Sequence, residues 1–225
     1  MLGLRLREPD GPLTVLALGA HADDLEIGCG GTLLRLQQLY HGLRVHWVVI
    51  GCEDEQRARE AERSAYALLD AGAVDVTLGR HPDAFFPYRG EEVKRDFERL
   101  KGEVRPDVVF THYRHDLHQD HRLVCELTWN TFRDHLILEY EVPKYDGDLG
   151  SPNLFVHLDG ELAEQKIAHV LEHFPSQTAR RWFTADLFRA LMRIRGMESN
   201  APSGLAEAFY ARKLVVASVP VDGSP

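Results

Sequence analysis

Short apolar runs alternate with longer amphipathic stretches over most of the chain, and this alternation decides the fold class. Residues 13–20 are almost continuously apolar and rich in branched side chains, which is typical of a strand buried on both faces of a parallel sheet. The alternation predicts strands at 13–20, 44–51, 74–79 and 107–112 and helices at about 29–41, 54–71, 90–104 and 120–135. We therefore expect a Rossmann-like α/β fold, with a mostly parallel sheet and helices on both of its faces.

The pattern changes after residue 136, where loops become longer. The remaining elements are expected to be strands at 136–142, 153–158 and 205–217 and helices at about 160–174 and 178–195. Residues 143–152 and 196–204 are rich in residues that break both periodicities and predict loops of a length that suits substrate walls or a lid. The last five residues, 221–225, are expected to fray.

Composition restricts the classes of protein that fit. The 225 residues, 44% of them hydrophobic, suffice for one sizeable core, so a single domain over residues 1–225 is expected. No stretch approaches the roughly 20 apolar residues that span a bilayer, and charges near the start argue against a signal peptide, which favours a cytoplasmic protein. Cys29, Cys52 and Cys125 are widely spaced, so neither a disulfide framework nor a thiolate zinc site is indicated. The net charge of −9 argues against a nucleic-acid partner.

Histidine and aspartate gather where two of the predicted strands end. His21 and Asp24 follow the strand at 13–20, and His121 follows the strand at 107–112. Open α/β sheets bind ligands at the carboxyl edge of their strands. If the two strands are neighbours, these three side chains can hold one ion and leave a fourth position open, as in a hydrolytic zinc site. The alternative for Asp24 alone is a cap on the following helix.

Two segments carry a resemblance to a known family. Residues 20–24, Ala-His-Ala-Asp-Asp, resemble the Ala-His-Pro-Asp-Asp signature of the LmbE-like, or PIG-L, zinc-dependent N-deacetylases, and residues 118–121 resemble their His-Pro-Asp-His segment. Residues 166–177 are similar to the family's Lys…His…Ser-Gln helix, and residues 206–209 to its closing Glu-x-Phe strand. The resemblance implies that the chain removes the acetyl group of an N-acetylated amino sugar or glycoside, with Zn²⁺ or another divalent ion such as Fe²⁺ as cofactor.

The same resemblance suggests roles for the residues around the metal. Asp23 is adjacent to a ligand and cannot easily point the same way, so we expect it to face the open position and take a proton from a metal-bound water. The alternative is that Asp23 only bonds backbone amides of its loop. The family pattern gives the metal to His121 and leaves His118 to stabilise the oxyanion, with Asp120 orienting His118 through a ring nitrogen. No role is assigned to His112 or His115, which are expected to be solvated or structural.

Substrate-binding residues are less well marked. The family's Gly-x-Arg-Gly segment is absent after the second strand, and Arg57 is the candidate substitute. The alternative interpretation is that Arg57 belongs to an ion-paired face of a helix. Asp83 resembles the family's aspartate that bonds sugar hydroxyls, although alanine replaces the usual next glycine. Phe85, Phe86 and Tyr88 form either an apolar platform for a sugar or part of the core.

Other functions are compatible with parts of the pattern. A metal-dependent amidase acting on a non-sugar N-acyl metabolite would use the same residues. A receiver-like magnesium-binding signalling module would need an aspartate at the end of the third strand, where residues 78–81 read Leu-Gly-Arg-His. The glycines of 28–32 lack a Walker lysine and are expected to let the helix pack tightly against the sheet. Residues 173–177 are expected to shape the pocket or to form a contact between subunits of a homo-oligomer.

Overall fold

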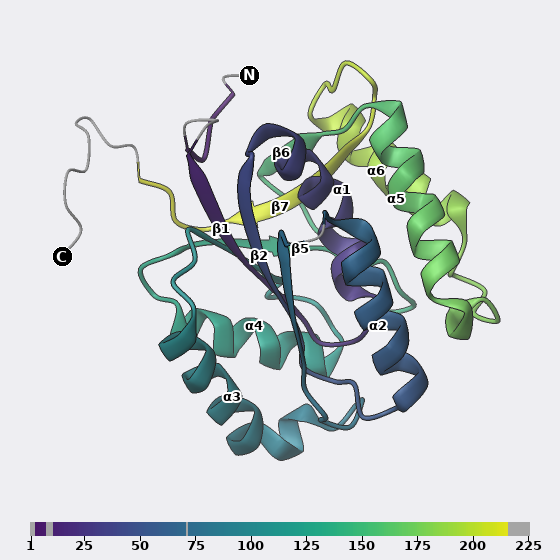
Figure 1. Ribbon diagram of the computed structural model, residues 1–225. Helices are drawn as coiled ribbons and strands as arrows, with labels where there is room; N and C mark the ends of the chain where they lie inside the picture. Colours follow the sequence, from purple (N-terminus) through teal and green to yellow (C-terminus); the bar gives the residue numbers. More distant parts are fainter. Residues whose placement is uncertain (1–2, 8–10, 71, 216–225) are drawn as a thin grey trace.

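The computed structural model describes residues 3–7, 11–70 and 72–215 and contains one seven-stranded sheet (Figure 1). Its strands are β1 (Pro12–Gly19), β2 (Gly42–Val49), β3 (Val74–Leu78), β4 (Val108–His112), β5 (Leu136–Tyr140), β6 (Leu154–His157) and β7 (Ala206–Ala211). They lie in the order β3-β2-β1-β4-β5-β7-β6. The strands β1 to β5 pair in parallel, and β7 is antiparallel to both β5 and β6. The predicted mostly parallel sheet is confirmed.

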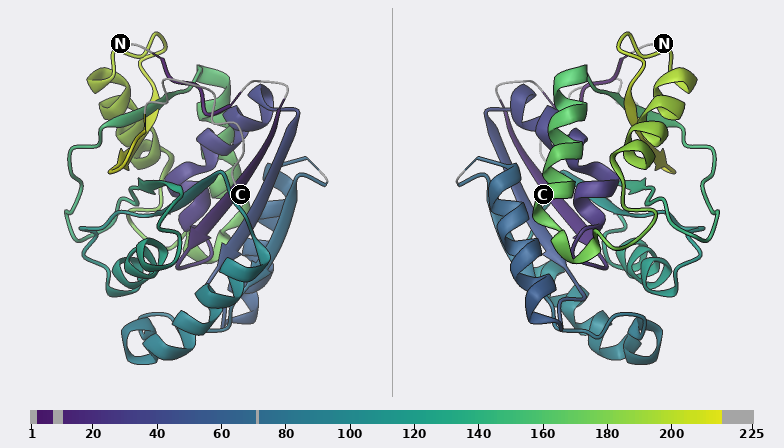
Figure 2. Two further views of the ribbon diagram at one scale, coloured as in Figure 1. Left: turned by 90° about the vertical axis from the view of Figure 1, so that its left-hand side faces the viewer. Right: turned by 90° about the vertical axis from the view of Figure 1, so that its right-hand side faces the viewer.

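Helices cover both faces of this sheet (Figures 1 and 2). They are α1 (Asp24–Leu39), α2 (Glu55–Leu68), α3 (Gly90–Glu103), α4 (Gln119–Thr131), α5 (Gly160–His173) and α6 (Ala185–Glu198), with the short 3₁₀ helices η1 (Phe86–Arg89) and η2 (Pro175–Gln177). The helices α3 and α4 pack on one face, and α1, α2, α5 and α6 lie on the other. The strand β1 sends Val15 and Ala17 to one core and Leu16 and Leu18 to the other, which explains its continuous apolar sequence.

The helix α1 begins at Asp24, earlier than the predicted start near residue 29. Glycines weaken a helix, so their density at 28–31 suggested a turn. In the fold they serve packing instead. A Cβ atom on Gly28 would lie 2.1 Å from a ring carbon of Tyr140, and one on Gly31 would lie 2.6 Å from Leu158. The predicted tight packing of this helix start against the sheet is therefore present, inside the helix rather than before it.

Two other boundaries lie far from the prediction. The helix α6 begins at Ala185 rather than near residue 178, because Thr184 caps it by accepting the Leu187 N–H at 3.3 Å. The strand β7 ends at Ala211, whereas the prediction continued to residue 217. The predicted frayed segment 221–225 lies outside the described residues. None of the helices in the described ranges has the length and apolar composition of a membrane span.

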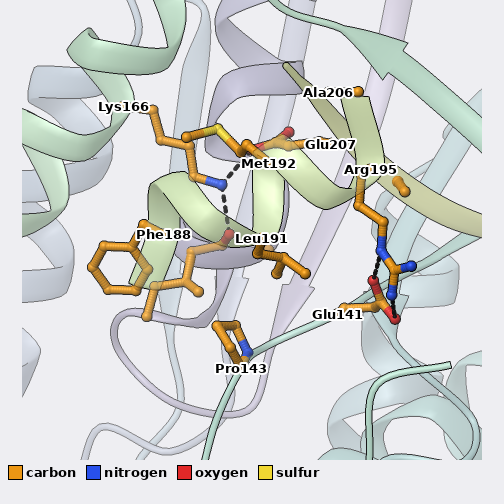
Figure 3. A pocket seen from close by; sticks show the side chains of 12 residues that line it. Glu141, Pro143, Lys166, Phe188, Leu191, Met192, Arg195, Ala206 and Glu207 are labelled. Atoms are coloured by element: carbon orange, nitrogen blue, oxygen red, sulfur yellow. Dashed lines mark hydrogen bonds and ion pairs between the residues drawn. The ribbon is translucent and has the colours of Figure 1, made fainter. Parts of the chain in front are cut away.

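Two buried ion pairs hold α5 and α6 in place, one to β7 and one to the segment after β5 (Figure 3). Lys166 of α5 donates to the Ile27 carbonyl at 2.6 Å and to Glu207 of β7 at 2.5 Å. Arg195 of α6 binds Glu141 with two hydrogen bonds of 2.9 Å each. The cavity between these pairs measures about 20 Å³, which holds a single water molecule and excludes a substrate.

Candidate metal centre and active site

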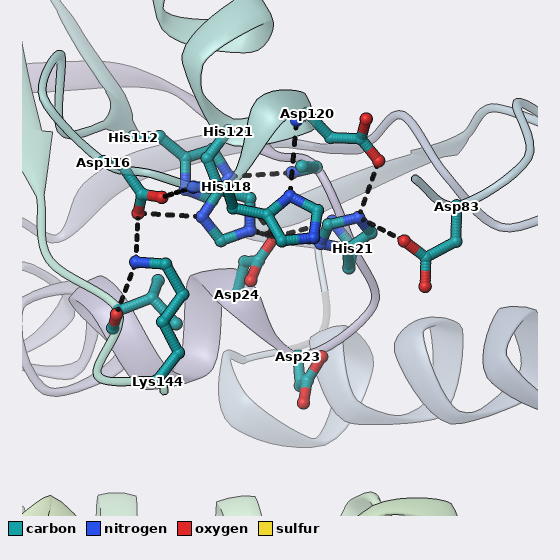
Figure 4. A network of polar contacts seen from close by, with 12 residues as sticks. His21, Asp23, Asp24, Asp83, His112, Asp116, His118, Asp120, His121 and Lys144 are labelled. Carbon is teal, nitrogen blue, oxygen red and sulfur yellow. Dashed lines mark hydrogen bonds and ion pairs between the residues drawn. The ribbon is translucent and has the colours of Figure 1, made fainter. Parts of the chain in front are cut away.

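The strands β1 and β4 are neighbours in the sheet, so the loops that follow them open at the same edge. The β1 loop and the first turn of α1 carry His21, Asp23 and Asp24, and the start of α4 carries His118 and His121. The structure brings the histidines of both segments together (Figure 4). The parallel pairing of β1 and β4, which are distant in sequence, thus brings the two parts of the site together.

Three donor atoms form a triangle of nearly equal sides. His21 Nδ1 lies 3.2 Å from His121 Nε2 and 3.4 Å from Asp24 Oδ2, and His121 Nε2 lies 3.5 Å from Asp24 Oδ2. Ligands bonded at about 2.1 Å to a tetrahedral zinc ion stand ~3.4 Å apart. The donors therefore fit one small divalent ion with little rearrangement. Overlapping groups that include His112 or His118 could also hold an ion.

The ionisation of the triangle follows from burial and mutual charge. Burial alone would raise the pKa of Asp24, but the His121 and His112 rings hold it well below its usual value. For His21, burial lowers the pKa and the Asp120 and Asp24 carboxylates raise it, with a net rise well above the usual value. Burial, assisted by His112, lowers the pKa of His121 to about 4. An ion that binds here must displace a proton from His21, so its affinity falls as the pH falls.

His112 borders the site, a position that the sequence did not predict. Its ring is fully buried and stacks on His121 with 3.8 Å between ring centroids. Its Nε2 accepts the Ala20 N–H at 2.9 Å and lies 3.3 Å from Asp24 Oδ2. Because this nitrogen already has a donor, His112 is less suited to bind a metal than the three donors of the triangle. His115, in contrast, is exposed, as expected.

Asp116 is a second residue that the sequence analysis missed. Its Oδ2 lies 2.9 Å from His121 Nδ1, and its Oδ1 accepts the His118 N–H at 2.8 Å. Burial would raise its pKa, but the contacts with His121 and, more weakly, with Lys144 lower it. The one available signal was its place, an aspartate in the same loop just before the two histidines. Asp116 therefore has the orienting role that had been given to Asp120, but toward His121.

Asp120 contacts a different histidine from the one predicted. Its carboxylate accepts the N–H groups of Ala84 and Phe86 and lies 3.2 Å from His21 Nε2, so it orients His21 rather than His118. The reason is helix geometry, since the first turn of α4 aims this side chain at the segment before η1. His118 is the N-cap of α4, and its Nδ1 accepts the Asp120 N–H at 3.3 Å. Burial, together with the charge of His21, lowers the pKa of His118.

Asp23 lies apart from the triangle, and its carboxylate points away from the histidine cluster (Figure 4). Although it is the N-cap residue of α1, its side chain makes no capping bond with any residue that the structure describes. Its Oδ1 pairs instead with Arg57 Nη2 at 2.5 Å. Arg57 is held in turn by Glu60 at 3.1 Å and by Ser176 at 3.2 Å. Burial raises the pKa of Asp23, and Arg57 opposes that rise.

The predicted substrate-binding residues differ in position and exposure. Asp83 is three-quarters exposed at the mouth of the site, and its Oδ1 lies 2.9 Å from His21 Nε2. Ala84 has a φ of 68°, a conformation that favours the glycine expected there. Tyr88 and Phe85 are exposed, with 6.1 Å between their ring centroids. The interpretation of Phe86 as part of a sugar platform is wrong, because its ring is fully buried under β1 and α3.

Comparison with known proteins agrees with this site. The family model described as GlcNAc-PI de-N-acetylase, PIG-L, matches residues 16–132, a range that contains both histidine and aspartate segments. The chain belongs to the PIG-L family. Members of the family are deacetylases, which hydrolyse amide bonds. The uncharacterized deacetylase YaiS of Escherichia coli (strain K12) is 28% identical over 169 residues, 71% of this chain and 89% of that protein.

Solved structures of this PIG-L chain's fold include enzymes of different activity. N,N'-diacetylchitobiose deacetylase from Pyrococcus horikoshii is 24% identical, with a TM-score of 0.70 over 91% of this chain and 86% of that one. GalB, the 4-carboxy-2-hydroxymuconate hydratase of Pseudomonas putida KT2440, is 16% identical, with a TM-score of 0.72 over 92% and 99%. At these identities the likeness establishes the fold alone. The assignment of a substrate must come from the residues of the site.

Proposed function

We propose that this PIG-L protein is a divalent-metal-dependent N-deacetylase that releases acetate from an N-acetylated amino sugar or glycoside. The observation that carries the proposal is the donor triangle of His21, Asp24 and His121. Zinc is the proposed ion, because the distances between the three donor atoms match those between the ligands of a tetrahedral zinc ion. The uninterrupted sheet from β1 to β7 supports one domain, and three buried unpaired cysteines suit the reducing cytoplasm.

The ion would be held by these three donors and would supply a Lewis acid and a bound water of lowered pKa. Asp23 is proposed as the base that takes the proton of that water. Arg57 pairs with Asp23 Oδ1, which leaves Oδ2 to accept a proton. The burial that raises the pKa of Asp23 makes it a stronger base than an exposed carboxylate. Arg57 thereby acts on Asp23, in addition to its proposed contact with substrate.

His118 is proposed as the donor to the oxyanion. Its Nδ1 accepts the backbone N–H of Asp120, so a neutral ring carries its proton on Nε2. The lowered pKa of His118 keeps the ring neutral at pH 7. A fixed N–H donor of this kind stabilises the negative oxygen of a tetrahedral intermediate. Asp120 supports the site by fixing His21, and the exposed Asp83 and Tyr88 are proposed to contact the sugar.

The proposal is tested by acetate release from UDP-linked, lipid-linked and free N-acetylhexosamines, with non-sugar N-acyl amides in parallel. We expect cleavage of an N-acetyl sugar by the zinc-loaded protein. Asp23→Ala should retain zinc and lose most activity, and Asp24→Ala should lose zinc, whereas the exposed Asp75→Ala serves as control. Full activity of Asp23→Ala would reject the base. Cleavage of a non-sugar amide alone would reject the sugar and favour the amidase alternative.

A further inference from the structure

The loop between β5 and β6 reaches the proposed metal centre through one nearly buried lysine. Lys144 Nζ lies 2.9 Å from Asp116 Oδ2 (Figure 4). The same nitrogen lies 2.5 Å from Asp148 Oδ2. Asp148 also accepts the Leu117 N–H at 2.7 Å, from the residue directly after Asp116. All three charged side chains are nearly buried, with 11%, 2% and 5% of their surfaces exposed. The loop is therefore attached to the segment that carries the histidines.

Asp116 transmits this contact to a proposed metal ligand. Its Oδ2, the same atom that Lys144 contacts, lies 2.9 Å from His121 Nδ1. A proton on Nδ1 leaves the lone pair of Nε2 free, and Nε2 is the His121 atom in the donor triangle. A carboxylate in this position fixes both the tautomer and the ring orientation of a metal-binding histidine.

Lys144 offsets the charge of Asp116 in a place where water cannot. A buried carboxylate without a cation is strongly destabilised, and Asp24 adds a second negative charge on the other side of His121. Without Lys144, we expect the Asp116 carboxylate to turn away from the site toward water, because it would otherwise remain as an uncompensated buried charge. This turn removes its contact with His121.

The loop also has anchors other than Lys144. Arg195 binds Glu141 before Lys144 and the Gly150 carbonyl after it, the latter at 3.0 Å. Tyr210 donates to the same glutamate at 2.8 Å. Replacement of Lys144 is thus expected to remove a charge without releasing the loop.

We propose that Lys144 is a positioning residue that acts through Asp116 to hold His121 ready for the metal. Lys144 thereby couples the β5–β6 loop to metal affinity. This inference rests on the metal site of the proposed function. Lys144 itself touches neither the donor triangle nor any proposed reacting atom. Metal affinity, rather than folding, is the property that it controls.

The test measures zinc dissociation constants by competition with a chromophoric chelator, without substrate. We expect Lys144→Met to bind zinc ~10–100-fold more weakly than the unchanged protein, and we expect a loss of the same size for Asp116→Asn. In the Asp116→Asn background, Lys144→Met should change affinity by less than about threefold, because the two act in series. The control is Lys94→Met, which removes another ion-paired lysine, on α3. The melting temperature of each metal-free variant reports folding, and Lys144→Gln replaces Lys144→Met if the latter does not fold.

Zinc affinity of Lys144→Met within about threefold of the unchanged protein would overturn the proposal. So would an equal loss in both backgrounds, since Lys144 would then act independently of Asp116. An unchanged protein that binds zinc but releases no acetate would reject the proposed function and leave this inference intact. An active Lys144→Met variant with unaltered zinc affinity would reject this inference alone.

Discussion

Glu26 makes the free energy of unfolding depend on pH, and the size of this effect follows from the structure. It lies in α1, is 1% exposed, and bonds Ser64 of α2, whose Oγ lies 2.9 Å from His169 Nε2 of α5. Burial raises the pKa of Glu26 to about 8 and lowers that of His169 to about 4. Near neutral pH the carboxyl is therefore protonated, and its Oε1 accepts the Ser64 hydroxyl beside the neutral histidine.

The sign of the effect follows from the raised pKa. The ordinary value is 4.5, so below pH 4.5 Glu26 is protonated in both the folded and the unfolded protein, and its stabilising term is fully present. Between pH 4.5 and about 8 the unfolded chain gives up the proton while the folded chain keeps it, so the folded state loses stability. At 1.36 kcal/mol for each pKa unit, the upper limit of this loss is about 5 kcal/mol. Glu26→Gln keeps a neutral side chain whose amide oxygen can accept the Ser64 hydroxyl, and it does not titrate.

The assay is urea unfolding of both proteins at pH 5.5, 7 and 9 in the presence of a chelator. The free energy of unfolding of Glu26→Gln should rise relative to the unchanged protein as the pH rises, by several kcal/mol over this range. The exposed Glu91→Gln serves as control and should show no trend. A difference between Glu26→Gln and the unchanged protein that stays constant within about 0.5 kcal/mol would refute the reasoning, because the carboxyl would then titrate alike in both states.

Two further substitutions test the packing of α1, each by urea unfolding. Gly28→Ala places a carbon 2.1 Å from the ring of Tyr140, whose hydroxyl is fixed on the Leu18 carbonyl at 2.7 Å, so a loss of ~1–3 kcal/mol is expected and an unchanged midpoint would contradict it. Lys166→Met leaves Glu207 as a buried carboxylate without its cation and should lower stability by ~3–5 kcal/mol. Adding Glu207→Gln should recover part of that loss, and a double variant as unstable as the single one would contradict the explanation.

The sequence predicted the site where its chemistry is local and its geometry follows from the sheet. His21 and Asp24 are three residues apart, and the end of a parallel strand can direct both at one ion. Their meeting with His121 needed only that β1 and β4 be neighbours, which the sheet order provides. A buried strand and a polar loop after it are patterns that a short window of sequence contains. The donor triangle was predictable for that reason.

The orienting residues could not be predicted, because their partners come from distant segments. Lys144 lies in a loop whose path is set by Arg195, on a helix later in the chain. Asp120 was assigned to His118, two residues before it in the sequence, but α4 aims it at His21. The burial of Phe86 likewise depends on α3 packing beneath η1. Side-chain direction at a helix start is decided by tertiary packing, which no periodicity reveals.

The similarity of the fold to both a deacetylase and a hydratase means that the scaffold does not choose the reaction. The proposed metal ion and the proposed base Asp23 would serve any addition of water. Amide hydrolysis also needs a donor where the carbonyl oxygen becomes negative. His118 is positioned for that task by a hydrogen bond from the first turn of α4, which directs its remaining proton away from the helix. In the proposed mechanism, the histidine that caps this helix, more than the proposed metal ligands, is what favours deacetylation.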